Sequence, residues 1–124
     1  MFYVIAKNVA FKIELLLILG MMLLQAEQRY RVLEVYGSNV NDRTYQQQMQ
    51  LLNLDAEGLK ERDMVIKSYL TSSAFKIVLR GKDGGVKFTD TKLLPLTKLY
   101  AIVDAMPMRR EEMHKKAKRK PTND

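Results

Sequence analysis

The chain has 124 residues and a formal net charge of +7, with no cysteine and a single histidine. A chain of this length holds one domain at most. Because redox exchange and disulfide formation both need thiols, the composition excludes thiol redox chemistry and disulfide bonds.

Two lysines precede a short apolar run near the start of the chain. Lys7 and Lys12 are followed by the apolar residues 15–24 and then by Ala26. This order is typical of a signal peptide, and the run is about half of the roughly 20 residues that a membrane-spanning helix needs. We expect residues 1–26 to be a signal peptide and the protein to be exported, either periplasmic or secreted. An uncleaved membrane anchor and a buried helix are the alternatives.

The first strand is predicted over residues 31–36, which are rich in β-branched and aromatic side chains. A turn cluster of glycine, serine and asparagine follows at residues 37–39. Glu34 interrupts the apolar run, so one face of this strand is expected to be less buried than a fully central position.

A helix is predicted to follow over residues 44–54, where apolar side chains recur at helical spacing. Asn41 and Asp42 offer the N-cap. Gly58 is expected to mark an end or a break. The polar side of this helix carries glutamines that we predict to be exposed to solvent: Gln46, Gln47, Gln48 and Gln50.

Three more strands are predicted, over residues 64–70, 75–80 and 86–89. Asp83-Gly84 lies between the last two and indicates a β-hairpin, because glycine accepts the positive φ that such turns require. A phosphate-binding loop would need a helix after the glycines, whereas a strand follows here.

The chain closes with a helix that is predicted to begin near Pro95. Pro107 lacks an amide hydrogen, so the helix is expected to kink or restart there. Asp104 is predicted to cap the restart and to pair with Arg109 or Arg110 across the kink. Nearby methionines are expected to fill the core, with an adaptable binding surface as the alternative: Met106, Met108 and Met113.

The order β-α-β, β-hairpin, α predicts an α/β sandwich with a mixed sheet. Three motifs add a family resemblance: Arg31-Val32-Leu33, the Gly-Lys-Asp-Gly-Gly turn at residues 81–85, and Met106-Pro107-Met108-Arg109-Arg110. With them the chain resembles the P-DUDES domain, a domain of unknown function in exported bacterial proteins and sushi-repeat-containing extracellular matrix proteins. The resemblance implies a minimal thioredoxin-like fold over residues 27–113, here without the extra helix between strands two and three. It implies no catalytic residues.

Catalytic groups are not apparent in this pattern. A thioredoxin-like active site would lie near residues 37–42, where Ser38 has no histidine or lysine nearby in sequence to activate it. His114 and neighbouring carboxylates could ligate a metal, but they lack a repeated ligand spacing. We therefore predict no catalytic residue, cofactor or metal site.

Positive charge is concentrated at the C-terminal end, where seven Lys or Arg residues fall between residues 109 and 120. Residues 114–124 are expected to be a flexible basic tail. The predicted partners are an anionic glycan, a lipid or an acidic protein. Nucleic acid is not expected, because this segment has no aromatic side chain for base stacking. The candidate anion-binding or partner-binding residues are Arg109, Arg110, Lys115 and Lys116.

The function that these observations favour is an exported, non-enzymatic binding or interaction module that uses its basic C-terminal end. The alternative is an extracytoplasmic enzyme or redox accessory that acts through a non-cysteine site. Because fold does not determine function, the resemblance does not separate the two.

Overall fold

The computed structural model describes residues 14, 16–18, 29–71 and 73–119. Its elements are, in chain order, β1 (Arg31–Gly37), α2 (Arg43–Asn53), α3 (Ala56–Glu61), β2 (Met64–Leu70), β3 (Lys76–Arg80), β4 (Val86–Asp90), α4 (Leu96–Asp104) and α5 (Pro107–Arg119). The expected signal peptide, residues 1–26, falls almost wholly outside the described residues and stays a prediction. None of the described helices has the length and apolar character needed to cross a bilayer.

The strands form one mixed sheet in the order β2-β1-β3-β4. β1 and β2 are parallel, β3 runs antiparallel to β1, and β4 pairs antiparallel with β3. The chain passes from β2 to β3 without an intervening helix, and the Thr71 amide donates to the carbonyl oxygen of Gly37 at 2.9 Å. This topology is the predicted α/β arrangement and is consistent with a small thioredoxin-like fold.

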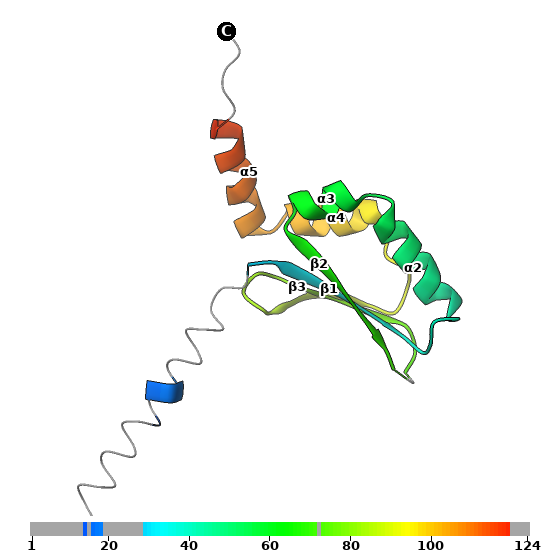
Figure 1. Ribbon diagram of the computed structural model, residues 1–124. Coiled ribbons are helices and arrows are strands. Elements are labelled where there is room, and N and C mark those ends of the chain that lie inside the picture. Colours follow the sequence, from blue (N-terminus) through cyan, green and yellow to red (C-terminus); the bar gives the residue numbers. More distant parts are fainter. Residues whose placement is uncertain (1–13, 15, 19–28, 72, 120–124) are drawn as a thin grey trace, which may run out of the picture.

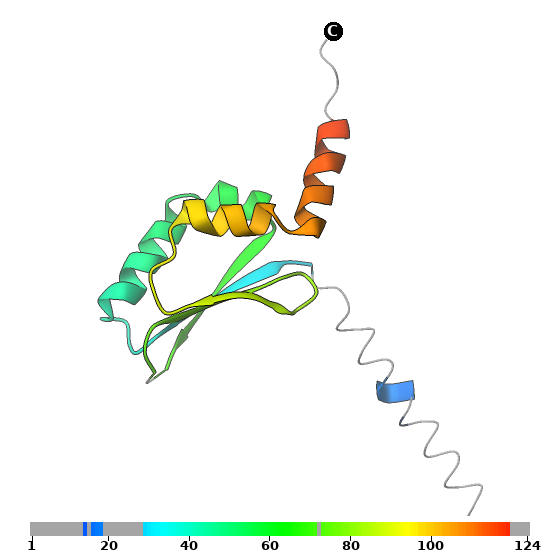
Figure 2. The ribbon, with the colours of Figure 1, turned by 180° about the vertical axis from the view of Figure 1, so that it is seen from behind.

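Helices α2, α3 and α4 lie on the same side of the sheet (Figures 1 and 2). Side chains of a strand alternate between its two faces, and the inward-facing ones of the two central strands are fully buried against these helices. The core therefore lies between the sheet and this helical layer. Its central side chains are Leu33, Val35, Ile77, Leu79, Leu52, Leu99 and Val103.

Glu34 points to the opposite face of β1, where Val32 and Tyr36 are partly exposed, as expected. Glu34 itself is only 7% exposed. Tyr36 Oη donates to its carboxylate at 2.6 Å, and the guanidinium of Arg80 forms an ion pair with it. Burial raises the pKa of Glu34, but the hydrogen bonds from Tyr36 and Arg80 outweigh it and leave that pKa lowered. The Glu34 carboxylate is thus buried, while its partners Tyr36 and Arg80 remain partly exposed.

The hairpin between β3 and β4 turns at Asp83-Gly84, as predicted. Gly84 has a φ of 79°, a conformation that a side chain would strain. Asp83 Oδ1 accepts from the Gly85 amide at 2.9 Å, and Asp83 Oδ2 accepts from Lys87 Nζ at 2.7 Å. The turn is therefore held by its own side chains.

Asp42 caps α2 as predicted, since its carboxylate accepts hydrogen bonds from the amides of Thr44 and Tyr45. The expected break at Gly58 is wrong. The chain breaks at Asp55, which caps α3 by accepting from the Gly58 amide at 3.0 Å, and Gly58 lies inside that helix. A Cβ at Gly58 would collide with the Asp55 carboxylate and would lie 2.6 Å from Tyr100 Oη. Glycine at this position therefore allows the Asp55 and Tyr100 side chains to lie close to the backbone of α3.

Helix α4 ends at Asp104 and α5 begins at Pro107, so the predicted restart is confirmed. Helix α5 then runs through the boundary expected at residue 114 and reaches Arg119. Residues 114–119 are thus helical and continuous with the domain, in contrast to the expected flexible tail. Residues 120–124 lie outside the described part of the chain.

The prediction that all four glutamines of α2 face solvent is wrong for Gln48, which is fully buried. Gln48 Nε2 donates to the Leu94 carbonyl oxygen at 3.0 Å, and the Leu94 amide donates to Gln48 Oε1 at 2.7 Å. Gln48 lies one helical turn before the buried Leu52, so both lie on the core side of α2. Its amide group thereby fixes the segment that leads into α4.

Replacing Gln48 by Met is expected to lower the free energy of unfolding by about 2–3 kcal/mol, because two buried backbone groups of Leu94 lose their partners. Gln47→Met is the matched control at an exposed position of the same helix, and there we expect a change within about 0.5 kcal/mol. Urea unfolding followed by circular dichroism measures both. Equal losses for the two variants would contradict this account of Gln48.

Candidate functional site

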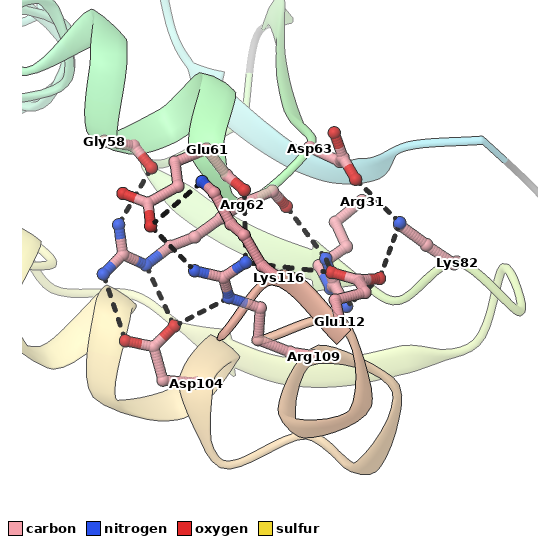
Figure 3. Close-up of polar contacts among 10 residues, drawn as sticks. All are labelled: Arg31, Gly58, Glu61, Arg62, Asp63, Lys82, Asp104, Arg109, Glu112 and Lys116. Carbon is pink, nitrogen blue, oxygen red and sulfur yellow. Dashed lines mark hydrogen bonds and ion pairs between the residues drawn. The ribbon is translucent and has the colours of Figure 1, made fainter. Parts of the chain in front are cut away.

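Helix α5 is joined to the domain by charged side chains more than by apolar ones. Figure 3 shows Arg109 and Glu112 of α5 directed toward side chains from β1, α3, α4 and the hairpin turn. Apart from Pro107, the apolar residues of α5 are Met108, Met113 and Ala117. We call the following residues the anchor cluster: Arg31, Glu61, Arg62, Asp63, Lys82, Asp104, Arg109 and Glu112.

Arg109 connects α5 to α3 and α4, and it is only 3% exposed. Its Nε donates to Asp104 Oδ1 at 3.1 Å, and its Nη1 donates to the Glu61 carbonyl oxygen at 3.2 Å. Arg62 donates to both carboxylate oxygens of Asp104, at 3.1 and 3.0 Å. Burial raises the pKa of Asp104, but the hydrogen bonds from Arg62 and Arg109 outweigh it, so that pKa is lowered.

Glu112 connects α5 to β1 and to the hairpin turn. Arg31 donates to both of its carboxylate oxygens at 3.2 Å, and Lys82 Nζ lies 2.7 Å from Oε1. Burial raises the pKa of Glu112, but the hydrogen bonds from Lys82 and Arg31 outweigh this effect, so that pKa is lowered. Burial lowers the pKa of Lys82, but its bonds to Glu112 and Asp63 raise it overall. Glu112 and Lys82 are therefore both charged at neutral pH.

The remaining surface of α5 is exposed and strongly basic. Lys115 and Lys116 are 68% and 63% exposed, and their nearest carboxylates, Glu111 and Glu61, are 3.8 Å away. Exposed pairs at such distances contribute little and leave the cations accessible. We call the following residues the basic surface of α5: Arg110, Lys115, Lys116, Lys118 and Arg119.

The structure separates the four residues that the sequence suggested for anion binding. Arg110, Lys115 and Lys116 lie on the basic surface of α5, whereas Arg109 is buried in the anchor cluster. Of the two arginines expected to pair with Asp104, Arg109 does so. Arg109 is thus committed to intramolecular carboxylates, and it is not available at the surface.

The segment where a thioredoxin-like thiol would lie, residues 37–42, holds a helix cap. Both the amide and the hydroxyl of Ser38 donate to Asp42 Oδ2 at 3.3 Å. The hydrogen bond from the Tyr45 amide, followed by that from Ser38, lowers the pKa of Asp42. Asp42 is therefore an ionised capping group. In the part of the chain that the structure describes, no three potential metal ligands gather into a site.

The fold and these motifs together define a small thioredoxin-like α/β domain that has no thiol. Residues 67–112 match the model of a family described as Domain of unknown function (DUF4174). The match runs from the middle of β2 to the second turn of α5 and includes the hairpin turn and the Pro107 restart. It is consistent with the resemblance to P-DUDES domains. Neither a curated protein nor a solved structure matches the chain.

Arg109→Ala and Arg110→Ala are expected to differ sharply in their effect on stability. Loss of the buried Arg109 leaves Asp104 and Glu112 short of a cation and is expected to cost about 3 kcal/mol of unfolding free energy. Arg110 is exposed, so its loss is expected to leave the melting temperature nearly unchanged. Thermal unfolding of both variants measures this. A melting temperature for Arg109→Ala equal to that of Arg110→Ala would refute the anchoring role of Arg109.

Stability is also expected to fall on acidification because of Glu112 and Asp104. The pKa of each is lower in the folded protein than its ordinary value of 4.5 or 3.8. Their contribution is fully present above those values and is lost as the pH falls through the lowered pKa. Glu112→Gln should therefore be less stable at neutral pH and lose less stability on acidification. Parallel curves of melting temperature against pH for the two proteins would contradict this assignment.

Proposed function

We propose that this protein is an exported, non-enzymatic binding module that holds an anionic glycan on the basic surface of α5. The observation that carries the proposal is the charge of this helix. Its exposed side chains include five Lys or Arg residues and the exposed carboxylate of Glu111. Such a local excess of one sign attracts partners of the opposite sign.

The attachment of α5 to the domain by the anchor cluster supports a binding role for this helix. Figure 1 shows α5 standing clear of the sheet at one end of the domain. Because Arg109 and Glu112 are tied to the domain, the direction of the helix is fixed before a partner arrives. A pre-ordered surface loses less conformational entropy on binding than a flexible tail does. The cations from Arg110 to Arg119 extend over about 14 Å of helix, which suits a polymer of negative charge.

The composition of α5 favours a glycan over the other anionic partners. A helix that lies in a membrane interface needs a continuous apolar face, and α5 has isolated apolar side chains. Aromatic side chains for base stacking are absent from this helix. A sulfated or carboxylated glycan needs only the spaced cations that α5 offers.

Heparin chromatography of protein purified from the extracytoplasmic fraction tests this function. That protein should begin at Glu27 if the chain is exported with signal cleavage. Lys115→Ala with Lys118→Ala is expected to elute at clearly lower salt than the wild type, because two cations of the basic surface are lost. The matched control, Lys60→Ala with Lys92→Ala, removes the same charge at exposed positions elsewhere and should elute near the wild type.

Equal elution of the two double variants would contradict a specific role for α5. Retention on vesicles of anionic lipid, or on an acidic protein, in place of heparin would contradict the choice of a glycan. Both double variants should keep the wild-type melting temperature, because all four side chains are exposed.

A further inference from the structure

Strand β2 forms one edge of the sheet, because β1 is its only neighbour among the described strands. The Arg31 amide donates to the Asp63 carbonyl oxygen, and the Thr71 amide donates to the Gly37 carbonyl oxygen, at 2.8 and 2.9 Å. Since backbone groups of a strand point alternately to its two sides, the odd-numbered residues of β2 bond to β1. The residues whose backbone N–H and C=O groups point away from β1, without a backbone partner in the described part of the chain, are Met64, Ile66, Ser68 and Leu70.

A groove of about 440 Å³ lies beside this edge, between β2 and the helices α2 and α3. Its apolar lining comes from Met49 and Leu52 of α2, Leu59 of α3, and Met64 and Ile66 of β2. A strand added to this edge would direct every second side chain to the helical side of the sheet, where the groove lies. The volume falls within the roughly 300–1,000 Å³ of ligand sites. The groove therefore has room for side chains of an added strand.

The other edge strand, β4, is less suited to accept a further strand. It has five residues, and its register with β3 is irregular between Leu79 and Arg80. Short edge strands and bulges are common ways of preventing further strand pairing. By contrast, β2 has seven residues and pairs with β1 in one unbroken register. The edge beside the groove is thus the one that favours an added strand.

Lys67, at the centre of β2, disfavours a second copy of this chain as the added strand. Its side chain is exposed and lies on the face of the sheet opposite the groove. If two copies of β2 paired antiparallel along their whole length, the two Lys67 side chains would lie directly opposite each other. Like charges in that position are destabilising, whereas an acidic residue there would form a favourable cross-strand pair.

The charge around this edge favours an acidic partner. Lys67 and Lys60, which lines the groove, are both exposed, and neither forms an ion pair within the described residues. Asp63 also lines the groove, but a lysine of the hairpin turn lies 2.9 Å from its carboxylate. Glu34, beside Lys67 on β1, is engaged by an arginine and a tyrosine. The carboxylates near the edge are therefore already paired, and the two lysines are not.

We propose that the edge of β2 binds an extended acidic segment of a partner protein, which pairs antiparallel with β2 and extends the sheet. Antiparallel pairing is slightly more stable per residue than parallel pairing. The backbone of the segment bonds to Met64, Ile66 and Ser68, its alternate apolar side chains enter the groove, and an acidic side chain on the other face lies opposite Lys67. Main-chain hydrogen bonds supply affinity in this mode of binding, and side-chain contacts supply specificity. This site lies on elements other than α5 and is independent of the glycan proposal.

The test is a titration of the isotope-labelled full chain with the synthetic peptide Thr-Val-Glu-Val-Glu-Val-Glu-Val-Thr, blocked at both ends and followed through amide chemical shifts. Saturable shifts are expected at Ile66 and Ser68. The same peptide with lysine in place of glutamate should bind about tenfold more weakly, because like charges then face each other. Binding of the lysine peptide as tight as that of the glutamate peptide would contradict the proposed charge of the partner.

Backbone methylation of the peptide tests the pairing itself. In the proposed arrangement the valine amides face β2 and the glutamate amides face solvent. N-methylation of two valines should therefore abolish saturable binding, whereas N-methylation of two glutamates, the matched control, should leave binding saturable. Equal behaviour of the two methylated peptides, or no saturable shift with the unmodified peptide, would overturn the proposal.

Ser68→Pro tests the location of the site, because it removes an outward amide hydrogen that β1 does not use, and edge strands tolerate such prolines. The midpoint for the glutamate peptide is expected to rise about tenfold, since one hydrogen bond is lost. Ser68→Ala keeps the amide and should bind as the wild type does. Thermal unfolding shows whether both variants fold. Equal binding by the two folded variants would place the site elsewhere.

Lys67→Gln tests the charge of the site without disturbing the backbone. The preference for the glutamate peptide over the lysine peptide should fall about fivefold, because the cross-strand charge pair is lost. Lys76→Gln, which removes the same charge from an exposed position on β3, two strands from the edge, is the matched control and should keep the wild-type preference. An unchanged preference in Lys67→Gln would refute the role of this lysine in selecting the partner.

Discussion

The carboxylate of Glu112 is the constraint on which the placement of α5 depends. It faces Arg31 from the first strand, Lys82 from the hairpin turn and Arg109 from its own helix. Arg31 and Lys82 would be costly to bury without it, because a cation taken out of water needs a nearby opposite charge. The Glu112 side chain thus joins α5 to Arg31 and Lys82, which lie 81 and 30 residues before it in the chain.

This constraint explains how a helix with so few apolar side chains can be part of the domain. Most helices are held by an apolar stripe against the core, whereas α5 is held at its base by paired charges and is polar beyond them. The anchor cluster contains four cations and four carboxylates, so its charge is balanced internally. The positive charge of the basic surface of α5 is not balanced in this way, and this excess makes the surface a candidate for binding an anionic partner.

The local elements were predictable from the sequence, because their signals are local. The segment 64–70, with its β-branched and aromatic side chains, predicted β2 with the observed bounds. Asp83-Gly84 predicted the hairpin, and Pro107 predicted the helix restart. Each depends on the backbone preferences of a few neighbouring residues.

The polar interior was not predictable, because it depends on contacts that are distant in sequence. Gln48 reads as one of several exposed glutamines, yet its partner is Leu94. From the sequence alone, Arg31 and Glu112 would be expected at the surface, but the fold brings them together as an ion pair. A single charged residue inside a long apolar run would indicate a buried charge. Arg31 and Glu112 instead have other charged residues beside them in the sequence, and such residues are usually exposed.

The buried charged residues of this domain lie away from the position that a thiol would occupy in a thioredoxin-like fold. The segment after the carboxyl end of β1, where a thiol would lie, is occupied by the cap formed by Ser38 and Asp42. The anchor cluster lies at the other end of β1, where the strand begins with Arg31. The anchored base of α5 therefore lies at the opposite end of that strand from the position of the missing thiol.

The most direct test of this account is the backbone mobility of α5, measured by ¹⁵N relaxation in the free protein. If the anchor cluster fixes the helix, order parameters for residues 108–116 should be about 0.85, the value of rigid backbone, and should match those of β1. Values below about 0.6 for these residues, with β1 remaining rigid, would show that the helix is not held and would contradict the account.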